Sequence, residues 1–167
     1  MPTLKQPPRH HKDSKQAKKP DQQICRLCGL IFLHARWMRD GKIERAWRKD
    51  KETTYILCPA CREIKQGTVA GTLVIDREFY QKNPTEIDRE IRNVEKIENQ
   101  RDPLKRILGI VKSRREVVVH ASRKELAVTI GKHLNRSRGG KLELRFSSHE
   151  DFVQVFLRAT PTKKNNG

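Results

Sequence analysis

The chain has 167 residues, of which 37 are lysine or arginine and 20 are aspartate or glutamate, giving a net charge of +17. Only 35% of the residues are hydrophobic, and no run approaches the roughly 20 apolar residues that cross a bilayer. No apolar segment of the secretory type follows Met1. We therefore expect a cytoplasmic protein that has no membrane partner and that binds a polyanion, such as RNA or DNA.

The positive charge is not confined to the ends of the chain, because residues 23–160 alone hold 29 basic and 18 acidic residues. Residues 1–22 are rich in lysine, proline and polar residues and nearly lack apolar side chains, so we expect a disordered basic tail. The composition of residues 161–167 predicts a second disordered tail. The folded part is thus expected between residues 23 and 160, and it is basic in its own right.

All four cysteines fall into two CxxC pairs, Cys25 with Cys28 and Cys58 with Cys61. A CxxC turn, or zinc knuckle, directs two thiolates at one metal, so two knuckles complete a tetrahedral site. Gly29 follows the first pair, where a knuckle turns tightly. The pairs predict one structural Zn²⁺ in a zinc ribbon over residues 23–70. The 29 residues between the pairs exceed the usual spacing and predict an extended hairpin or loop.

Three other interpretations of the cysteines compete with zinc. Two disulfides need an oxidising compartment, and a thioredoxin-type redox motif needs a single CxxC, so both fit less well. A rubredoxin-type iron centre uses the same two pairs and stays open as an alternative. Four thiolates fill the coordination shell, which indicates a structural site rather than a catalytic one. His34 is therefore interpreted as a surface residue or a neighbour of the site rather than as a spare ligand.

The segment between the two pairs is strongly basic and contains both tryptophans of the chain. Asp40-Gly41 predicts the tip of a hairpin. Arginine clamps phosphate and an indole stacks on an unpaired base, although either tryptophan could instead fill a small core. With basic residues further along the chain, the candidate RNA-binding set is Arg36, Trp37, Arg39, Lys42, Arg45, Trp47, Arg48, Lys49, Arg114, Arg115, Arg136 and Arg138.

Residues 71–160 show the patterns of a small mixed α/β module. Asn83-Pro84 predicts a helix start, and the apolar stripe that follows ends before Asp102. Ser122 and Glu125 form a capping box for a second helix, which ends at Gly139-Gly140. Strands are expected over 68–76, 115–121, 141–146 and 152–158, the last with a helix as the alternative, whereas 104–111 is ambiguous between strand and helix.

Two apolar stripes at helical spacing are the expected core faces of these helices. They comprise Ile87, Ile91, Val94 and Ile97 in the first helix and Leu126, Ala127, Ile130 and Leu134 in the second. The expected element order is β-α-β-α-β-β. The fold class is therefore predicted as α+β, namely a four-cysteine zinc ribbon with an enlarged basic hairpin, then an α/β module, behind a disordered basic tail.

No catalytic constellation is recognisable, because the chain lacks a phosphate-binding loop, a nucleophile elbow and a HExxH sequence. We therefore expect a protein that is not an enzyme and takes no small-molecule substrate.

The two CxxC pairs, the segment ILCPACREIKQGTVAGTLVID and the later VVVHASRKELAVTIGKHLNRSRGGKLEL carry a resemblance. Over residues 24–146 the chain resembles parts of the export-adaptor family for the large ribosomal subunit (nonsense-mediated decay protein three and its archaeal relatives). That family is much longer and has more than one cysteine cluster. The resemblance implies a zinc protein on a ribosome or ribosomal RNA, with ribosomal proteins as further partners and a role in assembly or stress.

The sequence thus favours a non-enzymatic zinc-ribbon protein that binds RNA on the ribosome. One alternative is a DNA-binding transcriptional regulator that uses the helix over 123–135, with Arg123, Lys124, Lys132 and Arg136 on the DNA. The other alternative is a zinc-ribbon adaptor for acidic protein partners.

Overall fold

The computed structural model describes residues 22–161. The two tails expected to be disordered, residues 1–22 and 161–167, lie outside this range apart from one residue of each. The elements fall into two parts, which we call the cysteine module (residues 22–67) and the sheet module (residues 71–161). The strands are β1 Gln23–Cys25, β2 Ile31–Leu33, β3 Arg36–Met38, β4 Thr54–Ile56, β5 Gly71–Asp76, β6 Ile107–Lys112, β7 Glu116–Ala121, β8 Lys141–Phe146 and β9 Val153–Arg158. The helices are α1 Gly41–Trp47, α2 Pro59–Gln66, α3 Arg77–Gln81, α4 Pro84–Arg101 and α5 Lys124–Arg138.

The cysteine module contains a four-stranded sheet of very short strands in the order β3-β2-β1-β4. The hairpin between β2 and β3 turns at His34 and Ala35, both with positive φ (50° and 61°), as a two-residue type I′ turn requires. The predicted hairpin tip at Asp40-Gly41 is wrong. Asp40 is instead the N-cap of α1, because its carboxylate accepts hydrogen bonds from the backbone N–H groups of Lys42 and Ile43 at 2.9 and 3.0 Å.

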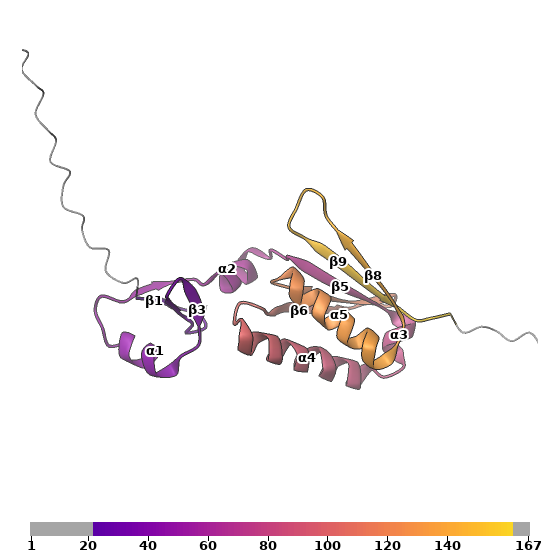
Figure 1. The fold of residues 1–167 in the computed structure, drawn as a ribbon, viewed down its shortest axis with the longest axis horizontal. Helices are drawn as coiled ribbons and strands as arrows, with labels where there is room; N and C mark the ends of the chain where they lie inside the picture. Colours follow the sequence, from indigo (N-terminus) through magenta and orange to yellow (C-terminus); the bar gives the residue numbers. More distant parts are fainter. Residues whose placement is uncertain (1–21, 162–167) are drawn as a thin grey trace, which may run out of the picture.

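The sheet module contains a five-stranded sheet in the order β6-β7-β5-β9-β8, in which β5 and β9 run parallel and all other neighbours run antiparallel. Helices α4 and α5 lie against one face of this sheet (Figure 1). Alternate strand residues point towards the helices and are fully buried, for example Leu73 and Ile75 on β5 and Val155 and Leu157 on β9.

The two predicted apolar stripes are confirmed except at one position. Ile87, Ile91 and Val94 of α4 and the whole stripe of α5 are buried, whereas Ile97 is 51% exposed. In the last turn of α4 the buried residue is Glu98, whose carboxylate accepts a hydrogen bond from Lys105 at 2.6 Å. The buried face of α4 thus passes through Glu98 rather than Ile97 in its last turns.

The segment 104–111, ambiguous in the sequence, forms most of strand β6, and a short helix α3 precedes α4, so the order in this module is β-α-α-β-β-α-β-β rather than β-α-β-α-β-β. The strand favoured over 152–158 is confirmed as β9. The capping box is wrong, because α5 has Arg123 at its N-cap and no side-chain cap. The Ser122 hydroxyl instead donates to the Leu104 carbonyl at 2.7 Å and accepts from the Arg106 N–H at 2.8 Å.

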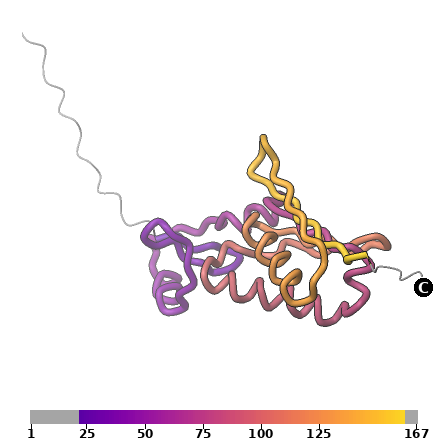
Figure 2. The backbone as a smooth tube through the Cα atoms, turned by 45° about the vertical axis from the view of Figure 1, so that its right-hand side comes forward, coloured from indigo at the N-terminus to yellow at the C-terminus, as the bar shows by residue number. Residues whose placement is uncertain are grey.

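The β8–β9 hairpin projects away from the rest of the sheet module (Figure 2). Among residues 22–161, no helix has the length and apolar character needed to cross a membrane.

Candidate metal centre

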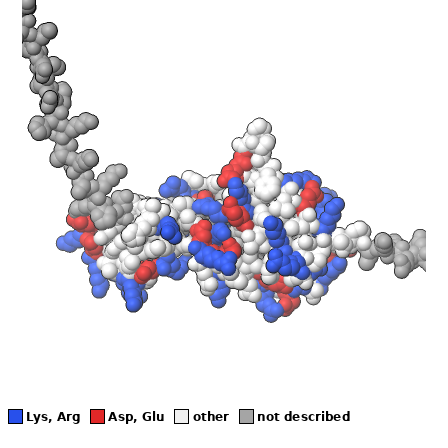
Figure 3. Space-filling view, in the orientation of Figure 1, with Lys and Arg blue, Asp and Glu red and all other residues white. Residues whose placement is uncertain are grey.

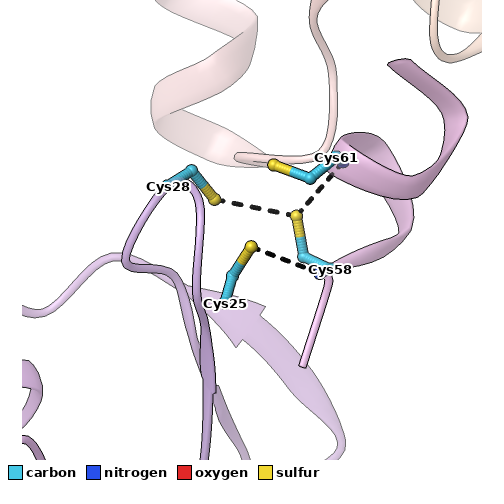
Figure 4. A group of neighbouring side chains, drawn as sticks. All are labelled: Cys25, Cys28, Cys58 and Cys61. Atoms are coloured by element: carbon cyan, nitrogen blue, oxygen red, sulfur yellow. Dashed lines mark hydrogen bonds between the residues drawn. The ribbon is translucent and has the colours of Figure 1, made fainter. Parts of the chain in front are cut away.

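The four cysteine thiols converge on one point in the cysteine module (Figure 4). All four Sγ atoms lie within 4.8 Å of one another, and the Sγ atoms of Cys28 and Cys58 are 3.7 Å apart. Four sulfurs placed 2.3 Å from a tetrahedral metal are separated by about 3.8 Å, whereas a disulfide needs about 2.05 Å. The cluster therefore has the dimensions of a tetrathiolate metal site, and all four cysteines are free of disulfides.

The first pair forms a knuckle at the end of β1. The backbone N–H of Cys25 donates to the Leu30 carbonyl at 2.7 Å, and the N–H of Gly29 donates to the Cys25 carbonyl at 2.9 Å. Gly29 has φ +73°, and a Cβ there would lie 2.5 Å from Glu44 Oε1. The expected tight turn at this glycine is confirmed.

The second pair differs from the predicted second knuckle, because it forms the first turn of helix α2. Cys58 is the N-cap, Pro59 is the first helical residue, and the Cys58 sulfur accepts from the Cys61 N–H at 3.4 Å. The Cys58 N–H in turn donates to the Cys25 sulfur at 3.3 Å. The positive end of the helix dipole therefore lies beside the thiols, where it favours thiolate. Proline directly after the cysteine was the local signal for this helix.

A guanidinium from the sheet module contacts the cluster. Arg106, just before β6, donates from Nη2 to the Cys28 sulfur at 3.3 Å and from Nη1 to the Cys61 sulfur at 3.6 Å. Its Nε donates to the Pro103 carbonyl at 3.0 Å. Arg106 is not among the candidate site residues named from the sequence, since nothing near it in the sequence points to cysteines 45 and 78 positions away.

Without a cation, the thiols of this cluster do not ionise together. A hydrogen bond from Cys58 lowers the pKa of the Cys28 thiol to about 4; burial opposes this, and Arg106 assists it. The same hydrogen bond, together with burial, raises the pKa of Cys58. Burial raises the pKa of Cys61 to about 11. A bound divalent cation would allow all four thiols to ionise together, and its binding would release their protons.

The donor set is complete without the histidine considered as a spare ligand. Among residues 22–161, the only group of side chains close enough to hold a metal ion consists of the four cysteines. His34 lies exposed in the β2–β3 turn. Soft sulfur donors in a closed tetrahedron suit zinc or iron.

Five of the candidate RNA-binding residues form an exposed basic surface on the cysteine module. None of the five has an ion pair within the described residues, and Lys42, Arg45 and Lys49 share one face of α1 and the turn after it. The set, which we call the module cations, is Arg36, Arg39, Lys42, Arg45 and Lys49. Arg48 differs, because its guanidinium is bound to Glu44 at 2.7 Å.

Both tryptophans are half-buried. Trp37 lies against Phe32, with ring centroids 5.3 Å apart, and packs on the buried cysteine cluster. The structural role considered for the tryptophans is therefore present at Trp37, which in addition lines a surface groove. At Trp47 the backbone carbonyl accepts a hydrogen bond from the Thr53 hydroxyl at 2.7 Å.

The remaining four candidates do not join the module cations. Arg114 and Arg115 lie in the β6–β7 turn, and five residues along β7, about 17 Å, separate that turn from the end near the cysteines. Arg136 and Arg138 are in the last turn of α5, and Arg138 is bound to Glu90 at 2.6 Å. Figure 3 shows basic side chains over both modules, so the basic surface is not one continuous patch at the metal centre.

No protein-family model matches this chain, and a search of curated proteins finds no matching relative. Conclusions about function therefore depend on the chemistry of the site.

Proposed function

We propose that this protein is a non-enzymatic RNA-binding protein, stabilised by one structural zinc ion, that acts on the ribosome or ribosomal RNA. The observation that carries the proposal is the set of module cations on the same module as the cysteine cluster. They are exposed guanidinium and ammonium groups that form no ion pair within the described residues. A polyphosphate backbone supplies the charge that such a surface lacks.

The contrast with the sheet module supports this assignment. Many of its cations are held by carboxylates, as in the pairs Lys112–Asp88 at 2.5 Å and Arg138–Glu90 at 2.6 Å. Further pairs join Arg92 to Glu95 and Arg145 to Glu143. The five module cations, by contrast, form no ion pair within the described residues.

The metal proposed is zinc, because a closed site of four thiolates is typical of structural zinc. Arg106 and the backbone N–H groups of Cys58 and Cys61 offset the negative charge of such a centre. Elemental analysis of the purified protein is expected to find one zinc per chain. One iron per chain, with a coloured thiolate centre, would contradict the zinc assignment and leave the RNA proposal standing.

The ribosomal part of the proposal draws on the resemblance to the subunit export-adaptor family, which stays a prediction. It is tested by sedimenting the tagged protein from lysate through a sucrose gradient with and without RNase. We expect migration with a ribosomal subunit that RNase abolishes. Protein at the top of both gradients would reject the ribosomal assignment.

The DNA-binding alternative is less well supported, because two of the four basic residues expected to contact DNA are held in ion pairs, whereas Lys132 and Arg136 are exposed. On α5, Arg123 is bound to Glu63 at 2.7 Å, and Lys124 is bound to Asp151. The face with Ile130 and Leu134 packs on the sheet.

A competition assay decides between RNA binding and DNA binding. Duplex DNA that displaces bound RNA at equal concentration would favour the DNA regulator. A lysate pull-down that survives nuclease would favour the protein adaptor.

A further inference from the structure

The two modules meet at a groove of about 350 Å³, a volume within the range of small-molecule sites. One wall is β3 of the cysteine module and the residue after it, and the other is the C-terminal end of α4. The side chains that matter for its chemistry are Arg36, Trp37, Arg39, Asn99, Gln100 and Arg101.

The groove is electropositive. Arg36 and Arg39 are exposed and have no ion pair within the described residues. Arg101 makes only a long contact of 3.4 Å with Glu98, and its side chain is 74% exposed. No aspartate or glutamate lines the groove. Glu98 itself is occupied by Lys105 at 2.6 Å. An anionic ligand is therefore favoured.

The groove also offers groups that recognise a planar heterocycle. Trp37 provides an aromatic surface, and arginines beside it provide flat guanidinium groups. Asn99 donates through Nδ2 to the carbonyls of Pro103 and Lys105, both at 3.1 Å, which holds the side chain in place. Gln100 is exposed, and its side-chain carboxamide has no hydrogen-bond partner among the described residues. Carboxamides of this kind pair with base edges.

We propose that this groove binds one unpaired nucleotide of an RNA, with the base against Trp37 and the neighbouring phosphates on Arg36, Arg39 and Arg101. This inference rests on the proposed RNA-binding function and adds a preference for bulged or single-stranded RNA over a continuous duplex. An acidic peptide would satisfy the arginines but would leave Trp37 and the carboxamide of Gln100 without a matching partner. A nucleotide is therefore the ligand that can contact both the β3 side and the α4 side of the groove.

The test measures the ratio of the affinities for two RNAs. A general loss of positive charge lowers both affinities alike and leaves this ratio unchanged. Two fluorescently labelled RNA stems are compared by anisotropy, one with a two-nucleotide bulge and one fully paired. The zinc-loaded full chain is expected to bind the bulged stem about tenfold more tightly, the effect of one stacked base. The double variant Arg39→Ala with Arg101→Ala is expected to bring the ratio of the two affinities close to one. Gln100→Ala is expected to lower this ratio only partly.

The matched control is Arg114→Ala with Arg136→Ala, which removes the same charge from the far end of the sheet module and should keep the ratio. Zinc content and circular dichroism establish that each variant is folded. Wild-type protein that binds neither stem would reject the proposed function and this inference together. Binding to both stems with equal affinity, or a groove variant that keeps the bulge preference, would reject only the groove. A polyglutamate peptide that displaces the bulged stem as well as unlabelled RNA does would also reject it.

Discussion

Arg106 links the metal centre to the sheet module through a single side chain. Its guanidinium donates to two cysteine sulfurs and to the Pro103 carbonyl at once. Only a planar fork of N–H donors can do this, and an ammonium group provides no such fork. A positive charge at this position also offsets the negative charge of a tetrathiolate centre.

We therefore expect Arg106→Ala to weaken zinc binding by about 10- to 100-fold, the usual effect of removing a group that hydrogen-bonds a metal ligand. Arg106→Lys should recover only part of the affinity, because it restores the charge without the fork. Competition with a chromophoric chelator measures both variants. Arg115→Ala, a remote charge change, is the control. Unchanged zinc affinity in Arg106→Ala would show that the guanidinium has no role at the metal.

Gly29 and Gly41 form a matched pair for testing the knuckle. Gly29 has φ +73°, whereas Gly41 is the first residue of α1 and its added Cβ would meet only Arg45 at 3.5 Å. We expect Gly29→Ala to destabilise the zinc-loaded protein by about 1–2 kcal/mol, because an L-residue is strained in the left-handed region. Gly41→Ala should be neutral or stabilising. Denaturant titration measures both, and equal effects of the two changes would contradict the argument.

At the scale of elements, Glu90 joins the two long helices. Its Oε1 accepts from Arg138 Nε at 3.0 Å and Nη2 at 2.6 Å, and its Oε2 accepts from the Ser137 hydroxyl at 2.7 Å. Burial by itself would raise the pKa of the Glu90 carboxyl, but the hydrogen bonds from Ser137 and Arg138 hold that pKa below its usual value. A lowered pKa in the folded state means that the ionised form stabilises the fold above the ordinary carboxyl pKa. This stabilisation is lost as pH falls through the folded value.

Glu90→Gln is expected to reduce the free energy of unfolding at pH 7 by about 1–2 kcal/mol, because Arg138 loses its charged acceptor. The difference from wild type should shrink below about pH 4, where the wild-type carboxyl also becomes neutral. Urea unfolding of both proteins at each pH measures this, and acid effects on the cysteines are common to both. Glu86→Gln, whose partner Arg89 is exposed, is the control. A difference that persists at low pH would contradict the electrostatic explanation.

At the scale of the whole molecule, we expect the stability of the two modules to depend on the proposed metal to different degrees. The buried cluster of the cysteine module comprises Cys25, Leu30, Cys58, Ala60 and Cys61, so most of it is metal ligand. The sheet module has a separate and much larger apolar core built from α3, α4, α5 and three strands. A small module without an adequate core of its own depends on metal for stability.

Removing the proposed zinc with EDTA, or substituting Cys58→Ser, is therefore expected to open the cysteine module and leave the sheet module folded. Hydrogen exchange followed by mass spectrometry should show lost protection over residues 22–67 and retained protection over β5, β7, β9 and α5. RNA affinity should fall at the same time, since the module cations lose their scaffold. Retained protection over 22–67 in the metal-free protein would reject the dependence on metal.

The elements most accurately predicted were those with long local patterns. Helix α4 and the buried residues of α5 followed from apolar spacing, because one packed face repeats every three to four residues. The short elements of the cysteine module were missed. Asp40-Gly41 is compatible with a hairpin turn and with a helix N-cap, and packing of the surrounding chain selected the N-cap. The Ser122 hydroxyl donates to the Leu104 carbonyl instead of capping α5, so the predicted capping box does not form.

The sequence by itself determined the candidate metal ligands, because the i, i+3 spacing of CxxC brings two thiols together both in a knuckle, as at Cys25, and in the first turn of a helix, as at Cys58. It also determined the basic character of the surface, since charge is a property of composition. Only the tertiary structure decided that Arg106 reaches Cys28 across 78 positions, and that Arg39 and Arg101 face one groove. Those contacts exist because the two modules, each with its own buried cluster, pack against each other. No local sequence pattern determines the relative position of the two modules.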